Sequence, residues 1–446
     1  MTTFKKYLSL FIIILLCTQH AEAQDNIYPV PAHKGSFLIT HAVIHIGNGQ
    51  IINDGTIKIT NGKIESVGAS TATAAASGIN VIDAGGKHVY PGLISSITNL
   101  GLREVTSGVR GANDFAEIGD INPSVRAIVA YNTDSKVIGT LRSNGILLAN
   151  IIPQDEEEGS SSLLTGSSSV VQLDAWTWKD AAYKTDGQFH LNMPSLIVRP
   201  SFFAPAPGQA PQPDPVKAAL EKIDRIKAFF KQGKAYAANA MHDQNNLKYA
   251  SLKELYTKKQ KLFVHCNTVR EMLLAMDFVT EFGFDIVIVG GSESWQIAPL
   301  LKQNNIQVIL QQLHSLPRTV EDDVDRPFTT PAVLQKAGVL FALSDNDGTT
   351  RGRNLMFNAG TAVAYGLTKE EALSAITLNA AKILGIADRT GSVEAGKDAN
   401  IIISDGDILD MKSSVISHAF IQGRMIDLQN KQTQLYDRYK YKYGLK

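Results

Sequence analysis

The sequence predicts an α/β fold: a (β/α)8 TIM-like barrel with a small β-sandwich domain built from both chain ends. Three observations predict it. Residues 36–90 and 391–428 hold short β-type runs separated by Gly and Asn turn signals, which is typical of antiparallel strands. Between them, apolar runs alternate with helical patterns, as in parallel strands joined by helices. The 446 residues suffice for a barrel of about 250 residues and a second domain.

The start of the chain has the pattern of a secretory signal. Residues 1–23 contain a basic start (MTTFKK), a short apolar run and an AEA cleavage site that ends at Ala23. The apolar run is too short to span a bilayer comfortably, and attachment of a lipid at Cys17 is an alternative. We therefore expect cleavage after Ala23 and secretion, to the periplasm, with no membrane span after removal of the signal.

Charge and cysteine content exclude several classes of partner and cofactor. Lys+Arg and Asp+Glu both total 43, so no charge excess favours nucleic acid or an anionic membrane as a partner. After signal cleavage Cys266 is the only cysteine, which excludes an intramolecular disulfide and a cysteine metal cluster. The expected partner is a small-molecule substrate or ligand.

The patterns divide the chain into four parts. These are residues 1–23 as signal peptide, 24–90 with 388–430 as a composite β-sandwich, 91–387 as the barrel and 431–446 as a C-terminal tail. The tail alternates aromatic and basic residues, which favours a helix that docks its tyrosine face on the protein. The barrel strands expected from the apolar runs are 93–99, 145–152, 168–174, 195–200, 261–267, 285–291, 307–311 and 339–345.

Two motifs mark the entry to and the exit from the barrel. Residues 86–94 have the sequence GKHVYPGLI, and residues 367–403 have LTKEEALSAITLNAAKILGIADRTGSVEAGKDANIII. With these motifs the sequence resembles the amidohydrolase superfamily, in particular its imidazolonepropionase-like branch. The resemblance implies one or two divalent metal ions at the C-terminal ends of the strands, where a metal-bound water attacks a C–N carbonyl.

The resemblance also implies a metal-ligand set, of which this chain keeps little. The family has His-x-His on strand one, a Lys or Glu on strand four, a His on strands five and six, and an Asp on strand eight. Ile97 and Asn99 stand at the paired histidine positions, and Gly290 stands at the strand-six histidine. The segment expected as strand four has no Lys or Glu, and His190 is expected in a loop before it.

Two ligand positions of the family are retained. The resemblance assigns His265 on strand five and Asp345 after strand eight as metal ligands, with Asp345 also as the catalytic base. Asp347 would share the face of Asp345 if the strand continued, and it is an extra donor together with Asn99. Such an oxygen-rich set suits a hard cation better than zinc. The expected cofactor is therefore zinc or another divalent metal, or none if too few ligands remain.

Each candidate residue also has a structural alternative. His265 could be a hydrogen-bonded histidine of the core, without a metal. Asp345 could cap a helix or pair with Arg351 or Arg353. Asn99 and Arg351, which lie beside the expected site, are candidates for binding a substrate.

Two functions follow from these expectations. The first is an exported hydrolase that acts on a non-peptide or cyclic amide C–N bond of a small molecule, with an incomplete metal site. The second is a catalytically inactive family member, which acts as a binding protein or as the partner subunit of an intact paralogue in an oligomer. The loss of ligands favours the second, because loss of even one normally weakens metal binding strongly.

Overall fold

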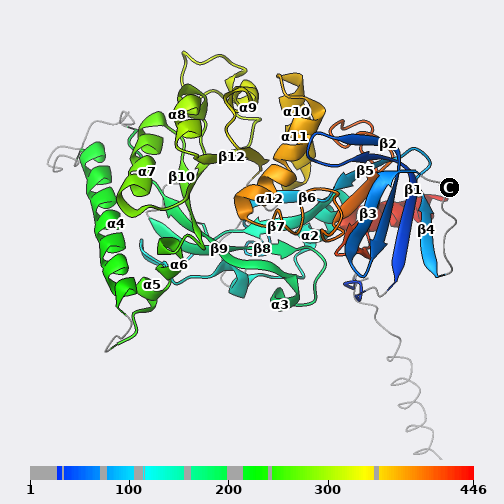
Figure 1. Cartoon of the computed structure of the whole chain (residues 1–446), viewed down its shortest axis with the longest axis horizontal. Helices are drawn as coiled ribbons and strands as arrows, with labels where there is room; N and C mark the ends of the chain where they lie inside the picture. Colours follow the sequence, from blue (N-terminus) through cyan, green and yellow to red (C-terminus); the bar gives the residue numbers. More distant parts are fainter. Residues whose placement is uncertain are drawn as a thin grey trace, which may run out of the picture.

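The computed structural model describes residues 28–32, 35–70, 78–104, 114, 116–154, 162–197, 214–239, 244–345 and 351–445. The expected signal peptide and Asp347 lie outside these ranges. The fold has two sheets of eight strands each, and Figure 1 shows them side by side. One sheet is formed by the two ends of the chain, and the other forms the barrel.

The first sheet brings the two chain ends together. Its strand order is β16-β15-β14-β5-β1-β2-β3, and β4 pairs in parallel with β1. The antiparallel pairing of β14 with β5 joins the ends. The strands share one apolar core, while their packing as the two layers of a sandwich stays a prediction. The strands are β1 (Ser36–His45), β2 (Ile51–Thr60), β3 (Lys63–Ala69), β4 (Ile79–Asp83), β5 (His88–Pro91), β14 (Ile401–Ser404), β15 (Ile416–Ile421) and β16 (Arg424–Met425).

The second sheet follows the chain order from β6 to β13 and curls into a nearly closed barrel. Strands β13 and β6 lie at the two ends of this sheet, and a side chain, not backbone-to-backbone hydrogen bonds, connects them. The Ser344 hydroxyl accepts from Ile97 N and donates to Ile97 O, both at 3.2 Å. The strands are β6 (Leu93–Thr98), β7 (Ile146–Ile151), β8 (Leu164–Gln172), β9 (Ala182–Asn192), β10 (Lys261–Cys266), β11 (Ile286–Gly290), β12 (Gln307–Gln311) and β13 (Phe341–Ser344).

The expectation of a regular (β/α)8 barrel is wrong at β8. This strand is antiparallel to both β7 and β9, whereas the other neighbours in the sheet are parallel. Parallel neighbours need a crossover of a dozen or more residues, while antiparallel neighbours need only a short connection. Between β8 and β9 the chain has only residues 173–181, which include the one-turn helix α3 (Trp178–Ala181). The chain therefore turns back at this point.

The expected fourth strand at 195–200 is also wrong. Residues 193–197 form no strand, and 198–200 lie outside the described part of the chain. The fourth barrel strand is β9, and it contains His190, which was expected in a loop. Polar residues alternate with apolar ones along β9 because its polar side chains face the barrel interior, so it lacks the apolar run typical of a buried strand.

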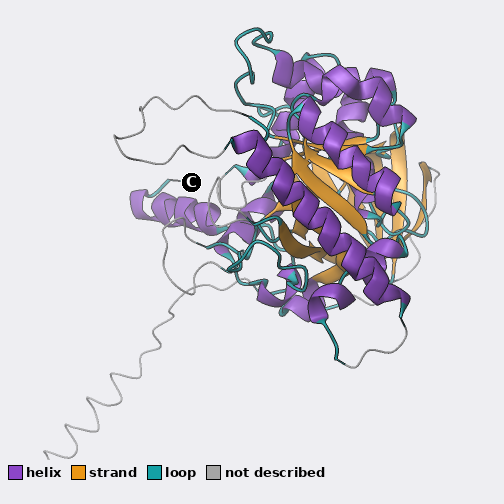
Figure 2. Ribbon diagram, turned by 90° about the vertical axis from the view of Figure 1, so that its left-hand side faces the viewer, coloured by secondary structure: helices purple, strands orange, loops and turns teal. Residues whose placement is uncertain are grey.

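Helices cover the outside of the barrel strands (Figure 2). A capping box of Thr268 and Glu271 starts α7, and Gly283, in the left-handed conformation with φ 74°, ends it. Within the described ranges no helix is long and apolar enough to cross a membrane. Besides α3, the α-helices of the described chain are α2 (Lys136–Ser143), α4 (Pro215–Ala238), α5 (Leu247–Ala250), α6 (Lys253–Tyr256), α7 (Val269–Phe282), α8 (Ala298–Gln303), α9 (Arg326–Ala337), α10 (Leu355–Ala364), α11 (Lys369–Ala375), α12 (Leu378–Leu384) and α13 (Lys431–Tyr443).

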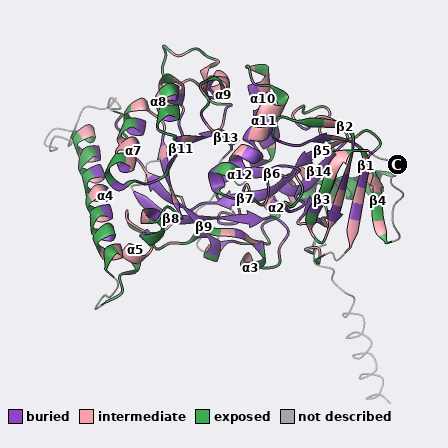
Figure 3. Cartoon of the chain, in the orientation of Figure 1, coloured by how far each residue is buried: buried purple, intermediate pink, exposed green. Residues whose placement is uncertain are grey.

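The barrel is filled with side chains, and Figure 3 shows its strands as buried. Ile97, Phe263 and Val289 belong to an apolar cluster inside it, which also includes Leu384 of α12. The carbonyls at the end of α12 accept from two lysines at the starts of β9 and β10. Lys184 Nζ donates to Leu384 O at 3.0 Å, and Lys261 Nζ donates to Ile383 O at 2.8 Å. Thus α12 closes the N-terminal end of the barrel, and its opposite end is the mouth.

The C-terminal segment forms the expected helix, but the helix does not dock its tyrosines. Tyr436, Tyr439 and Tyr443 on α13 are each more than half exposed. Basic residues on the same helix pair with the rings instead, as Lys440 does with Tyr436.

Candidate functional site

The predicted site residues sit at the C-terminal ends of three barrel strands. Asn99 follows β6, His265 is the next-to-last residue of β10, and Asp345 follows β13. In the sheet β13 neighbours β6 across the bridged gap, whereas β11 and β12 separate β10 from β13. The structure therefore brings Asn99 and Asp345 to adjacent strands and leaves His265 on the far side of two strands.

Strand one supplies an apolar residue and an amide where the family has histidines. Ile97 is fully buried in the barrel cluster. Asn99 is 5% exposed, and its Nδ2 donates to Gln154 Oε1 at 3.2 Å. Its Oδ1 is buried and has no partner among the described residues.

His265 is paired with a second histidine. His190 Nδ1 lies 2.9 Å from His265 Nε2, so one ring donates and the other accepts. The two strands run in parallel with Asn192 opposite His265, and the His190 ring packs edge-on against Phe263. Burial lowers the pKa of His265 to about 4. Burial, and then the charge of His265, also lowers the pKa of His190, so both rings are neutral at pH 7.

His190 is a member of the site that the sequence patterns did not predict. A signal for it exists in QFHLN, where Gln188, His190 and Asn192 alternate with the outward-packing Phe189 and Leu191. Such a period of two is the mark of a strand. It would have placed His190 on the same face as its polar neighbours, directed toward the barrel interior.

At strand six the backbone itself excludes a ligand side chain. Gly290 has φ 101°, a conformation that residues with a Cβ rarely adopt. A Cβ at this position would lie 2.6 Å from Asn267 Oδ1 and 2.9 Å from Cys266 O. A histidine at position 290 would therefore require this part of the chain to move.

Asp345 is held by residues of the following helical segment. The carboxylate is 4% exposed, and its Oδ2 accepts from Asn358 Nδ2 at 3.5 Å. Arg351 Nη2 lies 3.8 Å from Asp345 Oδ1. Pairing with Arg351 was the structural alternative for Asp345, and the structure contains that pair. The catalytic role of Asp345 and the substrate-binding role of Arg351 stay predictions.

The described donors do not fit the family's metal centre. No group of three or more His, Cys, Asp or Glu side chains that could hold a metal ion occurs in the described ranges. A catalytic zinc normally has three protein ligands. The Nε2 atom of His265 is already hydrogen-bonded to His190, and Ile97 and Gly290 offer no donor side chain. The metal role of His265 and Asp345 thus lacks support from the geometry and stays a prediction.

The barrel instead contains buried polar atoms without a partner. These are Asn99 Oδ1, Asn150 Oδ1 and His190 Nε2, each unpaired within the part of the chain that the structure describes. Asn150 on β7 is fully buried, and its Nδ2 donates to Ser96 O at 3.1 Å. A buried polar atom without a hydrogen bond costs about 1–3 kcal/mol. Water or a ligand at these three atoms would remove that cost.

Comparison with known proteins agrees with the fold and the motifs. Residues 321–426 match the family model described as Amidohydrolase family, a stretch that covers β13 and the exit motif. This match and the relatives below support placing the chain in the amidohydrolase superfamily.

The similar proteins include imidazolonepropionases. The chain is 36% identical to that of Flavobacterium psychrophilum over 109 residues, or 22% of this chain and 26% of that protein. Thus the alignment spans only about a quarter of that relative. The imidazolonepropionase of Polaromonas sp. is 25% identical over 378 residues, which cover 78% of this chain and 82% of that protein.

A solved structure shares the overall fold. The amidohydrolase from Thermotoga maritima MSB8 superposes with a TM-score of 0.74 at 23% identity, covering 88% of this chain and 99% of that one. This likeness supports the barrel architecture.

Proposed function

We propose that this protein binds a small amide or cyclic amide at the mouth of its barrel, without the metal centre of its family. The observation that carries the proposal is the His190–His265 pair. The contact occupies Nε2 of His265, and Ile97 and Gly290 stand at two other ligand positions of the family.

The unpaired polar atoms support the chemical class of the ligand. Asn99 Oδ1 and Asn150 Oδ1 are acceptors, so they require N–H or O–H donors. His190 Nε2 donates or accepts according to its tautomer. A neutral ligand that carries both N–H and C=O groups matches this set, as amides and cyclic amides do.

Hydrolysis of the C–N bond of such a ligand is the second candidate. It is favoured by Asp345, which lies after β13 at the position of the family's catalytic Asp, and by the relatives named as imidazolonepropionases. A divalent metal or another water-activating group would then have to be held in part by residues outside the described ranges.

Export and assembly complete the proposal. The pattern of residues 1–23 supports secretion to the periplasm. Ile97 and Gly290 at two ligand positions of the family support a role as partner of an intact paralogue, and a homo-oligomer is the alternative assembly. A fractionation experiment with and without a periplasmic wash tests the location. Mass measurement of the native assembly tests the partner.

The binding proposal is tested by calorimetric titration of the mature protein with hydantoin and 2-pyrrolidone. Asn150→Ala should weaken binding about tenfold, because it removes one hydrogen bond in a buried site. The matched control is Asn304→Ala, an exposed amide before β12 at the other end of the barrel, which should leave binding unchanged. Turnover of the probe would favour the hydrolase, while no binding of either probe, or equal binding by both variants, would contradict the proposal.

A further inference from the structure

A cavity lies near the start of β7. Its volume is about 600 Å³, and it is enclosed by α2, α13 and the residues that follow β8. Leu173, which lines it, donates its N–H to Leu147 O at the start of β7. The cavity is therefore distinct from the site formed around Asn99 and Asp345.

The lining of this cavity is basic. Four cationic side chains line it, against the single carboxylate of Asp134. Ser135, at the start of α2, donates its hydroxyl to Glu104 Oε2 at 3.0 Å and does not cap the helix. The four cationic residues are Lys136, Arg142, Lys431 and Arg438.

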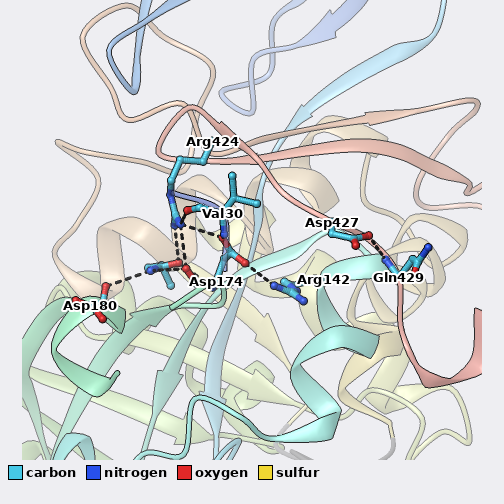
Figure 4. A network of polar contacts seen from close by, with 8 residues as sticks. Val30, Arg142, Asp174, Asp180, Arg424, Asp427 and Gln429 are labelled. Atoms are coloured by element: carbon cyan, nitrogen blue, oxygen red, sulfur yellow. Dashed lines mark hydrogen bonds and ion pairs between the residues drawn. The ribbon is translucent and has the colours of Figure 1, made fainter. Parts of the chain in front are cut away.

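Arg142 is the buried member of this set, and it has too few partners. Its side chain is 7% exposed, and its Nη1 donates to Asp174 Oδ1 at 2.6 Å (Figure 4). Nε has no partner among the described residues, although a guanidinium has five N–H donors. Asp174 is shared, because Arg424 Nη1 donates to its Oδ2 at 2.9 Å.

The charges around Arg142 act on its pKa in opposite directions. Burial lowers the pKa of Arg142, which reflects the cost of a desolvated cation, while Asp174 and Asp427 oppose that effect. Arg424 adds a second positive charge beside the same carboxylate. An anion within the cavity would offset the excess of cationic side chains in its lining.

We propose that this cavity binds a small organic oxyanion, a carboxylate or a phosphate ester. The guanidinium offers the planar, forked donors that match such groups. Ile138, Leu173 and Leu435 line the same cavity and would contact an apolar part of the ligand. The volume lies in the range of small-molecule sites, which is about 300–1,000 Å³.

Such a ligand would also link α13 to the barrel. The helix α13 has no buried residue, while Lys431 and Arg438 extend from it to the cavity. An oxyanion between these side chains and Arg142 of α2 would join the two helices by charge. Binding should therefore slow hydrogen exchange along α13.

The test is calorimetric titration of the mature protein, at low ionic strength, with butyrate, with phenyl phosphate and with inorganic phosphate. The first two probes distinguish a carboxylate from a phosphate ester, and the third reports whether an apolar part is needed. Arg438→Gln and Lys431→Gln change exposed side chains and should each weaken binding severalfold. Arg142→Lys keeps the charge but loses the fork, and should weaken binding about tenfold.

The matched control is Lys179→Gln, an exposed lysine on α3 outside the cavity, which should bind as the unchanged protein does. Asn99→Ala at the barrel mouth should also leave binding unchanged, which separates this site from the proposed function. No heat with any probe, or equal weakening in the Lys179 control, would overturn the proposal. If Arg142→Lys lowers Tm strongly, its loss of binding could come from misfolding. The exposed variants Arg438→Gln and Lys431→Gln then decide the outcome.

Discussion

At the residue scale, the histidine pair makes stability depend on pH. The pKa of His265 is about 4 in the folded protein and about 6.5 when exposed, so the unfolded chain takes up a proton first as the pH falls. Stability should therefore be full above pH 6.5 and decline as the pH falls toward 4. The shift corresponds to a loss on the order of 3 kcal/mol from this residue.

Urea unfolding at pH 7.5 and pH 5 measures this effect. The difference in unfolding free energy between the two pH values should shrink in His265→Gln, which has no proton to take up. His41→Gln is the control, because His41 is exposed and pairs with Asp83 at the surface. An unchanged pH dependence in His265→Gln would contradict the assignment of the effect to this pair.

Gly290 gives a second prediction at this scale. Gly290→Ala should destabilise the protein by about 1–3 kcal/mol, because it combines a positive φ with a Cβ that approaches Asn267 Oδ1 to 2.6 Å. Gly283 also has a positive φ, 74°, but a Cβ added there would have no atom within 4 Å. Gly283→Ala therefore measures the backbone strain without the close contact, and it should cost less than Gly290→Ala. Thermal unfolding compares the two, and equal costs would rule out the close contact as the cause.

Sequence patterns predicted some of these residues and missed others for a physical reason. The positions of Ile97, His265 and Asp345 at strand ends followed from the strand pattern and the family motifs. The partner of His265 did not, because His190 is 75 residues away in sequence and its pairing depends on the register between β9 and β10.

At the element scale, the start of α7 fixes the chain that follows β10. Glu271 is 5% exposed, and its carboxylate accepts from Asn267 N, Thr268 N and Leu196 N at 3.0–3.3 Å. These bonds satisfy backbone donors that would otherwise be buried without a partner. The capping box therefore holds the loop that carries Met193–Leu196 against the end of β10.

Glu271→Ala should lower the free energy of unfolding by about 2–3 kcal/mol, because several buried N–H groups lose their acceptor. The comparison is Glu371→Ala, which removes the same motif from α11 at a less buried position and should cost about 1 kcal/mol. Chemical denaturation of both variants measures the difference. A smaller cost for Glu271 than for Glu371 would contradict this account of the buried cap.

The elements that the sequence predicted best are those with one clear period. Strands β10 to β12 are nearly continuous apolar runs, and α7 has both a start and a stop signal. The strand expected at 168–174 overlaps β8, but its antiparallel direction was not predicted, because the direction of a strand depends on the length of its connections and on its neighbours. The polar β9 was not predicted because it lacks an apolar run.

At the scale of the whole molecule, a buried ion network joins the two sheets. Asp174 follows β8 of the barrel, and it is bound by Arg424 from β16 of the first sheet and by Arg142 from α2 (Figure 4). Val30, near the start of the described chain, donates its N–H to the same carboxylate at 3.0 Å. A single carboxylate thus connects segments that are hundreds of residues apart.

Asp174→Ala should destabilise the protein by about 3–5 kcal/mol, because it leaves two mostly buried guanidinium groups without their counter-ion. The control is Asp83→Ala, which removes an exposed partner of His41 and should lower Tm only slightly. Calorimetric Tm values of both variants test this. A loss near that of the control would show that the network contributes little to joining the sheets.

The central claim is that the barrel has exchanged its family's metal centre for a histidine pair. The most direct test is the divalent metal content of the mature protein, purified from rich medium without chelators, together with Tm after addition of zinc or manganese. The account predicts far less than one metal ion per chain and an unchanged Tm, both for the protein and for His265→Ala. A stoichiometric metal ion that is lost in His265→Ala would contradict it.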